Sequence, residues 1–125
     1  MQSPLKSGPG LARIVNAIRC AVQGLKDAYE HEHAFRQEIW VAVIAIPLAF
    51  ILPVAFLSKA LMVGSVLLIL IVELLNSAIE ATVDRISLDR HPLAKQAKDI
   101  GSAAVLLSIV NSVMIWALIL IEKLV

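Results

Sequence analysis

The sequence predicts an all-α membrane protein with three transmembrane helices and an N-terminal amphipathic surface helix. Its 125 residues are 59% hydrophobic and only 17% charged, whereas soluble domains average about 45–50% apolar and about 25% charged residues. Three spans of roughly 20 residues would take up about half of the chain. The remainder is too short for a separate soluble catalytic domain, which needs roughly 50 residues. Any chemistry must therefore depend on the membrane helices and the segments beside them.

Charge, cysteine content and motifs exclude several classes of protein. Eleven basic and ten acidic residues leave a formal charge of +1, so we expect no nucleic-acid partner. Cys20 is the only cysteine, which excludes an intrachain disulfide and a cysteine-rich zinc site. The sequence contains neither GxxxxGK[ST] nor GxGxxG, the motifs of the two standard nucleotide-binding folds. Residues 1–10 are rich in proline and glycine and lack the apolar core of a signal peptide. We expect them to form a disordered lead.

Residues 11–125 are interpreted as a single membrane domain that begins with a surface helix over about 11–34. Apolar residues recur there at steps of three and four, a pattern typical of a helix with one apolar stripe. They are Leu11, Ile14, Val15, Ile18, Val22, Leu25 and Tyr29. Basic residues among the polar positions favour a helix lying in the membrane interface. A soluble helix packed on a core is the alternative, but the chain offers little soluble core.

Three spans are predicted, at about residues 37–53, 60–84 and 97–121. Pro47 lies inside the first span and is expected only to kink it, while Pro53 is expected to end it. The second span continues past Glu73 into a more polar segment, and residues 85–98, with Pro92, are predicted to form a loop.

The distribution of basic residues predicts the orientation of the spans. Those on the N-terminal side of the first span and in the second loop are Arg13, Arg19, Lys26, Arg36, Arg85, Arg90, Lys95 and Lys98. The opposite side has only Lys59 and Lys123. By the positive-inside bias, the N-terminus and the second loop are cytoplasmic.

Glu73 is the first candidate functional residue, because a carboxylate inside an apolar span costs about 2.5–3.5 kcal/mol on insertion scales. Glu73, Ser77, Glu80 and Asp84 fall within roughly 40° of one another on a helix. Asn76 lies at the margin of this acidic stripe. Solvation near the helix end is the alternative for Asp84, as is an ion pair with Lys98.

The acidic stripe suggests two chemical roles. Carboxylates are hard oxygen ligands that hold Mg²⁺ together with substrate phosphates. A carboxylate in a low-dielectric place also has a raised affinity for protons, as a general base for an alcohol requires. Lys98, beside Asp99 and before Ser102, is a candidate counter-charge for phosphate, although a lysine that snorkels to the interface is the alternative.

Other polar and aromatic residues have more ordinary interpretations. His31, His33 and His91 do not have the spacing of a metal site. Asn111 is expected to form a hydrogen bond between helices. Trp40 and Trp116 are expected to anchor the spans at the interface, and Trp116 is also a candidate for lining a lipid groove.

Three strings resemble the bacterial integral-membrane diacylglycerol kinase family, which includes undecaprenol kinases. They are FRQE (35–38), VELLNSAIEATVDR (72–85) and AKDIGSAAV (97–105), in this order and spacing. The resemblance covers nearly the whole chain from about Arg13. It implies a homotrimer in the bacterial inner membrane that phosphorylates a lipid alcohol with MgATP at sites shared between subunits.

The resemblance also implies roles for individual residues. Glu73 would be the catalytic base, and Glu32 and Glu80 would hold the Mg²⁺ that bridges the ATP phosphates. The residues expected to contact ATP are Arg13, Cys20, Glu32, Asn76, Glu80, Asp89, Arg90, His91, Lys98 and Asp99. Those expected to contact the lipid are Arg13, Glu38, Glu73, Ser102 and Trp116.

Two positions depart from the family pattern. Cys20 stands where an aromatic ring is common, and Asn16 stands where a lysine can occur. Both bear on nucleotide contacts of the surface helix rather than on the base or the metal. The resemblance favours diacylglycerol over undecaprenol as the substrate. A small proton-coupled transporter would also explain Glu73, but it would not explain why Glu32, Glu80 and Lys98 lie on the same side.

Overall fold

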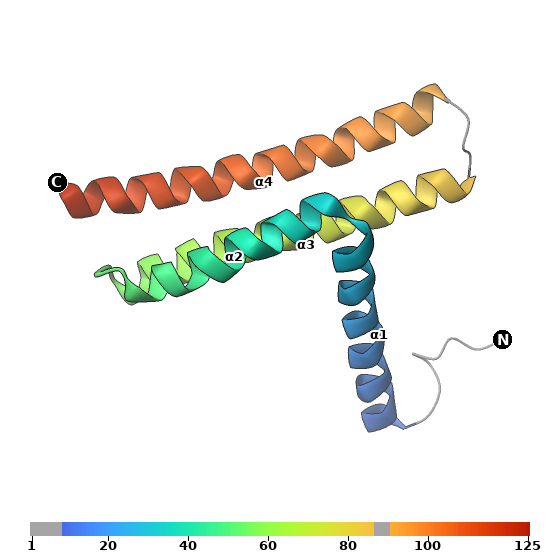
Figure 1. Ribbon diagram of the computed structural model, residues 1–125, viewed down its shortest axis with the longest axis horizontal. Helices are drawn as coiled ribbons and strands as arrows, with labels where there is room; N and C mark the ends of the chain where they lie inside the picture. The colour runs from blue at the N-terminus through green and yellow to red at the C-terminus, as the bar shows by residue number, and fades with distance from the viewer. Residues whose placement is uncertain (1–8, 87–90) are drawn as a thin grey trace.

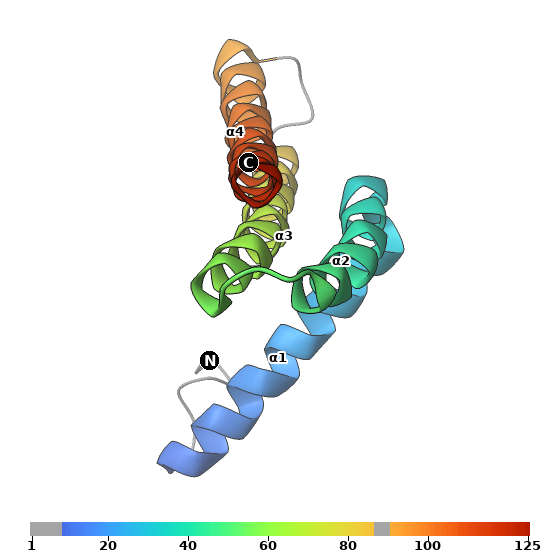
Figure 2. The ribbon, with the colours of Figure 1, turned by 90° about the vertical axis from the view of Figure 1, so that its left-hand side faces the viewer.

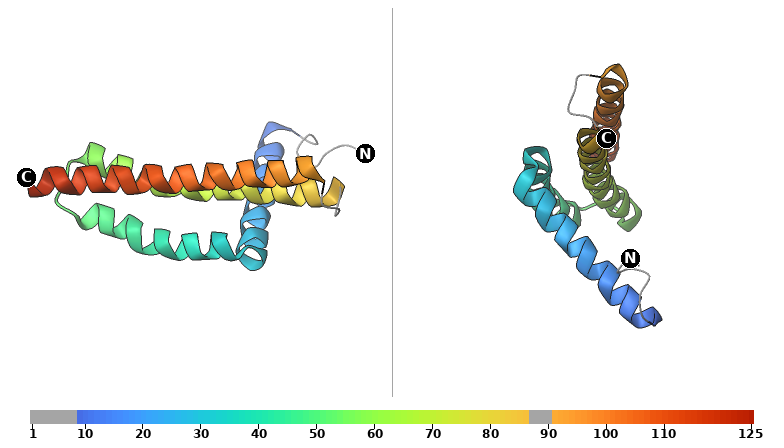
Figure 3. Two further views of the ribbon diagram at one scale, coloured as in Figure 1. Left: turned by 90° about the horizontal axis from the view of Figure 1, so that it is seen from above. Right: turned by 90° about the vertical axis from the view of Figure 1, so that its right-hand side faces the viewer.

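The chain folds into four helices, one of which leaves the other three at a wide angle (Figure 1). The computed structural model describes residues 9–86 and 91–125. The helices are α1 (Gly10–His31), α2 (His33–Ile51), α3 (Phe56–Ile86) and α4 (Pro92–Leu124). The three long helices α2, α3 and α4 run beside one another, while α1 projects away from them (Figure 3). The predicted all-helical architecture is confirmed.

Helices α2, α3 and α4 are each long and apolar enough to cross a membrane. At 1.5 Å per residue, the 19 residues of α2 span about 28 Å, which matches the roughly 30 Å hydrocarbon core of a bilayer. The 31 residues of α3 and the 33 of α4 span about 46 and 50 Å. Both helices are therefore long enough to cross the bilayer and extend several turns beyond it.

The helix ends differ from the predicted boundaries in ways that the local sequence explains. Helix α2 continues through Pro47 and ends at Ile51, because the residue before Pro53 is sterically driven to the extended conformation that Leu52 adopts. The predicted loop over 85–98 is too long, since α4 begins at Pro92. Proline suits the first helical turn, where its missing N–H is not needed. His91 caps this helix, and its Nδ1 accepts a hydrogen bond from the Leu93 N–H at 3.1 Å.

Helix α3 is the centre of the bundle, because both α2 and α4 pack against it (Figure 2). The buried residues of α2 are Phe35, Ala42 and Ala49, seven residues apart on one face. On α4 the buried residues are Gly101, Ser108 and Ser112. Small residues let helices approach closely where apolar solvent provides little driving force for packing.

Hydrogen bonds join α3 to α4 at the end of the bundle that lies away from α1. The hydroxyls of Ser65 and Ser112 are 2.8 Å apart. The Trp116 indole N–H donates to the backbone carbonyl of Met62 at 3.2 Å, and the Ser65 hydroxyl donates to the same carbonyl at 2.8 Å. Trp116 is thus held against α3 by its polar edge.

Gly101 provides the close contact nearer the other end, where the side chain of Asn76 from α3 lies against it. A Cβ atom at position 101 would overlap the Asn76 side-chain oxygen. Asn76 is itself only 8% exposed, so its side chain has little room to move away. The approach of α3 and α4 at this level therefore requires glycine.

We expect Gly101→Ala to lower the free energy of unfolding by about 1–3 kcal/mol, the usual cost of overpacking. Unfolding in detergent micelles, followed by circular dichroism, measures the change. Gly24→Ala is the control, because a Cβ there meets no atom within 4 Å, and replacing a helical glycine stabilises by about 0.5–1 kcal/mol. Adding Asn76→Ala to Gly101→Ala should recover the loss, and an equal loss in both glycine variants would contradict the packing argument.

Candidate active site

Glu73 is buried in the middle of α3, with 5% of its surface exposed. It lies on the face of α3 that also buries Met62, Val66 and Asn76. That face packs against the neighbouring helices, so Glu73 is removed from the surrounding lipid. The burial expected from its position in an apolar segment is therefore confirmed.

Three further glutamates gather near Glu73, and we call these four residues the carboxylate cluster. The charges of Glu80 and Glu32 act on Glu73, and the charge of Glu73 acts on Glu38. Glu73 and Glu80 come from α3, Glu38 from the first turns of α2, and Glu32 from the break between α1 and α2. Residues distant in the sequence thus come near one another in this part of the bundle, spread over about two turns of α3, because Glu73 and Glu80 are about 10 Å apart along its axis.

No basic side chain forms an ion pair with the carboxylate cluster within residues 9–86 and 91–125. The ion pairs there join Lys98 to Asp84 at 2.7 Å and Lys95 to Asp99 at 2.6 Å. Lys98 also interacts electrostatically with Glu80. Among the described residues, repulsion between these carboxylates is therefore not offset by a direct ion pair.

The donor atoms in the cluster suit a hard divalent cation. Across the described segments, the buried side-chain atoms without a hydrogen-bond partner are Oε2 of Glu38 and Oδ1 of Asn76. Asn76 donates through Nδ2 to Oε1 of Glu80 at 3.3 Å, while its buried Oδ1 lies against Gly101. Carboxylate and amide oxygens are the ligands that Mg²⁺ prefers. Glu32 and Glu80 carry oxygen donors of the same kind, and their role as metal ligands stays a prediction.

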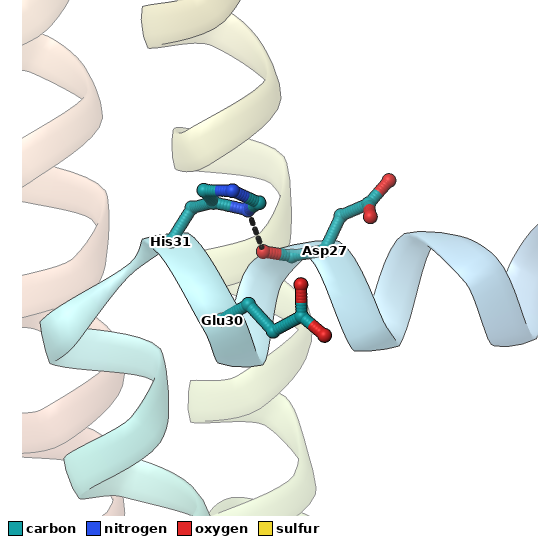
Figure 4. Close-up of side chains that lie close together, drawn as sticks. All are labelled: Asp27, Glu30 and His31. Carbon is teal, nitrogen blue, oxygen red and sulfur yellow. Dashed lines mark hydrogen bonds between the residues drawn. The ribbon is translucent and has the colours of Figure 1, made fainter.

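A second group of potential metal ligands lies on α1, where Asp27, Glu30 and His31 can bring one ligand atom each within 4.8 Å of the others. All three residues are exposed. Figure 4 shows the His31 ring turned toward the backbone carbonyl of Asp27, to which its Nδ1 lies at 2.9 Å. The Nδ1 of His31 is thus engaged by the backbone of its own helix.

An apolar cavity of about 430 Å³ lies beside the carboxylate cluster. It is bounded by α2, α3 and α4, and its lining includes Glu38, Ala45, Val66, Ile69, Ser112 and Trp116. Glu38 is its only acidic lining residue and also belongs to the cluster. The cavity therefore connects an acidic site to a hydrophobic space large enough for part of a lipid.

The structure brings some of the predicted site residues together and separates others. Glu38 and Trp116 line the same cavity, as their predicted role as lipid contacts requires. Arg13 and Cys20 are exposed on the part of α1 that points away from the bundle, and Ser102 and Asp99 are exposed on α4. Asp89 and Arg90 lie outside the described residues.

Two contributions to the site could not be inferred from residue spacing. One is the apolar lining from Ala45, Val66 and Ile69, which resembles any other part of an apolar span. The other is Arg36, which makes two hydrogen bonds to the end of α1. The sequence indicates Arg36 only as part of the FRQE string and as one of the basic residues that predict the orientation.

The fold and the site define an integral-membrane protein with a buried acidic centre that opens toward an apolar cavity. The profile of the prokaryotic diacylglycerol kinase family matches residues 19–120 of the chain. The diacylglycerol kinase of Pseudomonas aeruginosa is 52% identical over 119 residues, which are 95% of this chain and 97% of that protein.

Other diacylglycerol kinases are also similar over most of their length. That of Haemophilus influenzae is 45% identical over 111 residues, covering 89% of this chain and 94% of the relative. That of Escherichia coli K12 is 45% identical over 111 residues, covering 89% and 91%. The chain belongs to the prokaryotic diacylglycerol kinase family, and it is a kinase.

Proposed function

We propose that the protein phosphorylates diacylglycerol with ATP to give phosphatidic acid at the cytoplasmic face of a bacterial inner membrane. The observation that carries the proposal is the buried Glu73, surrounded by three more carboxylates next to an apolar cavity. A lipid alcohol reaches such a site from the bilayer, and a nucleotide reaches it from the aqueous side. The diacylglycerol kinases to which the chain is similar support this choice of substrate.

Glu73 is proposed to act as the general base. Its carboxylate takes the proton of the lipid hydroxyl as the hydroxyl oxygen forms a bond to the γ-phosphorus of ATP. The bond between that phosphorus and the oxygen bridging to the β-phosphate breaks, and ADP leaves. Phosphoryl transfer requires mainly positioning and charge neutralisation, so a single base and a set of aligned charges suffice.

Glu32 and Glu80 are proposed to hold the Mg²⁺ that accompanies ATP. When bound, this ion neutralises charge on the phosphates. Asn76 orients Glu80 through its amide. Lys98, at the start of α4, is proposed as a counter-charge to the phosphates, and Asp89, Arg90, His91 and Asp99 are proposed as further nucleotide contacts.

The lipid is proposed to place its acyl chain in the apolar cavity and its hydroxyl near Glu38 and Glu73. Trp116 closes part of the cavity, where its hydrogen bond to Met62 fixes the ring. Arg13 and Ser102 are proposed to contact the lipid at the entrance. Undecaprenol is the alternative substrate, and a direct comparison of the two alcohols distinguishes them.

A homotrimer is proposed because one chain leaves parts of the proposed site apart. The N-terminal half of α1, which carries Arg13 and Cys20, points away from the bundle (Figure 1). Its apolar stripe is exposed, including Leu11 at 75% and Ile18 at 59%. We propose that α1 lies in the cytoplasmic interface, where this stripe contacts lipid, and that it completes the site of a neighbouring subunit.

The proposed reaction is tested by incubating the purified protein in mixed micelles with [γ-³²P]ATP, Mg²⁺ and either diacylglycerol or undecaprenol. We expect radiolabelled phosphatidic acid, with diacylglycerol preferred. Faster labelling of undecaprenol would reassign the substrate, and no labelling of either alcohol would refute the proposed function.

Glu73→Gln should reduce kcat at least about 100-fold, because general base catalysis contributes about 10²–10⁴-fold and an amide cannot accept the proton. Steady-state kinetics in mixed micelles give the change, and circular dichroism checks that the variant folds. Glu122→Gln, an exposed substitution near the C-terminus, is the control. A folded Glu73→Gln protein with near-normal turnover would require another base.

Glu80→Gln should raise the Mg²⁺ concentration for half-maximal activity about tenfold, since loss of a group that supports a metal site typically costs 10–100-fold. Mg²⁺ titrations at fixed ATP measure this value. Glu30→Gln is the matched control, because Glu30 belongs to the exposed group on α1. If Glu30→Gln shifted the Mg²⁺ dependence and Glu80→Gln did not, the metal role would move to α1.

A further inference from the structure

The junction between α1 and α2 is an elbow formed by a single non-helical residue, Glu32. Helix α1 ends at His31 and α2 begins at His33, while Glu32 has φ −114° and ψ 107°. The Glu32 N–H donates to the Ala28 carbonyl at 2.9 Å. The Arg36 N–H donates to the Glu32 carbonyl at 3.1 Å. The backbone of Glu32 therefore closes α1 and opens α2.

Arg36, in the first turn of α2, reaches back to the end of α1. Its Nε donates to the Tyr29 carbonyl at 3.0 Å, and its Nη2 donates to the Glu30 carbonyl at 2.9 Å. Its guanidinium carbon lies 5.6 Å from the centre of the Tyr29 ring. One side chain thus contacts α1 at three points while its backbone belongs to α2.

These contacts provide hydrogen-bond donors and a positive charge to the C-terminal end of α1. The last four carbonyls of a helix have no partner within the helix, and a positive charge is favourable at that end. The guanidinium is a rigid planar fork, so two bonds to successive carbonyls fix its orientation. In the described part of the chain Arg36 forms no ion pair with a carboxylate. Its side-chain hydrogen bonds therefore join α2 to the end of α1 across the elbow.

We propose that Arg36 is a positioning residue, which sets the angle of the elbow and thereby holds Glu32 near Glu73. Glu32 is the only member of the carboxylate cluster outside a helix, so its place depends on how α1 and α2 are joined. A flexible elbow would let Glu32 leave the cluster while Glu38, Glu73 and Glu80 remained in place. The kinetic part of this inference rests on the proposed metal role of Glu32.

The kinetic test compares Arg36→Gln with the parent protein in Mg²⁺ titrations. We expect about a tenfold rise in the half-saturating Mg²⁺ concentration, as for other residues that orient metal ligands, and a KM for diacylglycerol within about twofold of the parent value. Arg36→Lys should recover part of the loss, since it keeps the charge but not the fork. Arg19→Gln, which removes a charge from α1, should change neither value. A purely structural role would lower the active fraction and leave the Mg²⁺ dependence unchanged, which would overturn the proposal.

A double-mutant cycle tests whether Arg36 acts through Glu32. In a Glu32→Gln background, Arg36→Gln should shift the Mg²⁺ dependence no further, because coupled residues have non-additive effects. Additive shifts would show that Arg36 acts on the site by another route and would overturn the proposal.

The elbow itself can be measured without any kinase assay. Nitroxides on Cys20 and on an Ala55→Cys variant lie on α1 and in the connection that joins the far end of α2 to α3. Labelled chains are diluted into unlabelled chains before reconstitution. Pulsed electron paramagnetic resonance should give a narrow distance distribution with Arg36 and a broad one with Arg36→Gln. An unchanged distribution would refute the positioning role. Failure of the parent protein to phosphorylate a lipid would refute the proposed function. The distance measurement would then still test whether Arg36 sets the angle of the elbow.

Discussion

Four carboxylates that repel one another are held in one region of a membrane bundle, and the rest of the site depends on this constraint. Glu73 is buried on α3, and the charges of Glu32 and Glu80 act on it. Packing must oppose that repulsion, because no basic residue in the described segments pairs with the cluster. The small residues between α3 and α4, and the bonds that close the elbow, supply this rigidity. Because its carboxylates repel one another, such a site is suited to bind a cation.

The central position of α3 gives the site access from two directions. Its cytoplasmic turns, by the proposed orientation, carry Glu80 and approach Lys98 on α4, whereas its apolar turns line the cavity with Val66 and Ile69. Glu38 belongs to both regions because α2 packs along the same helix. The proposed nucleotide and the proposed lipid therefore approach Glu73 from opposite sides. The nucleotide stays in water and the lipid stays in the bilayer.

Acidic residues that look equivalent in the sequence differ in exposure and in partners in the structure. Asp84 belongs to the acidic stripe, but it is half exposed and paired with Lys98 at 2.7 Å, which is the ion-pair alternative left open for it. Asp27 and Glu30 are exposed on α1 next to a histidine that bonds to the backbone. Glu73 is buried, and Glu32, Glu38 and Glu80 are partly buried, which distinguishes the carboxylate cluster from both groups. An exposed charged side chain is solvated at little cost in free energy, so its presence alone says little about function.

The order and type of the helices were predictable because apolar length and the three-to-four-residue period are local properties of the chain. The same is true of Glu73, whose burial follows from its apolar neighbours, and of the motif strings that indicated the family. The sequence could not show that Glu32 is a single-residue elbow, because Arg36 stabilises it through carbonyls six and seven residues away. Nor could it show the cavity or the meeting of Glu32, Glu38 and Glu73. Those features depend on the angles at which separate helices pack, and packing angles are decided only when the whole bundle forms.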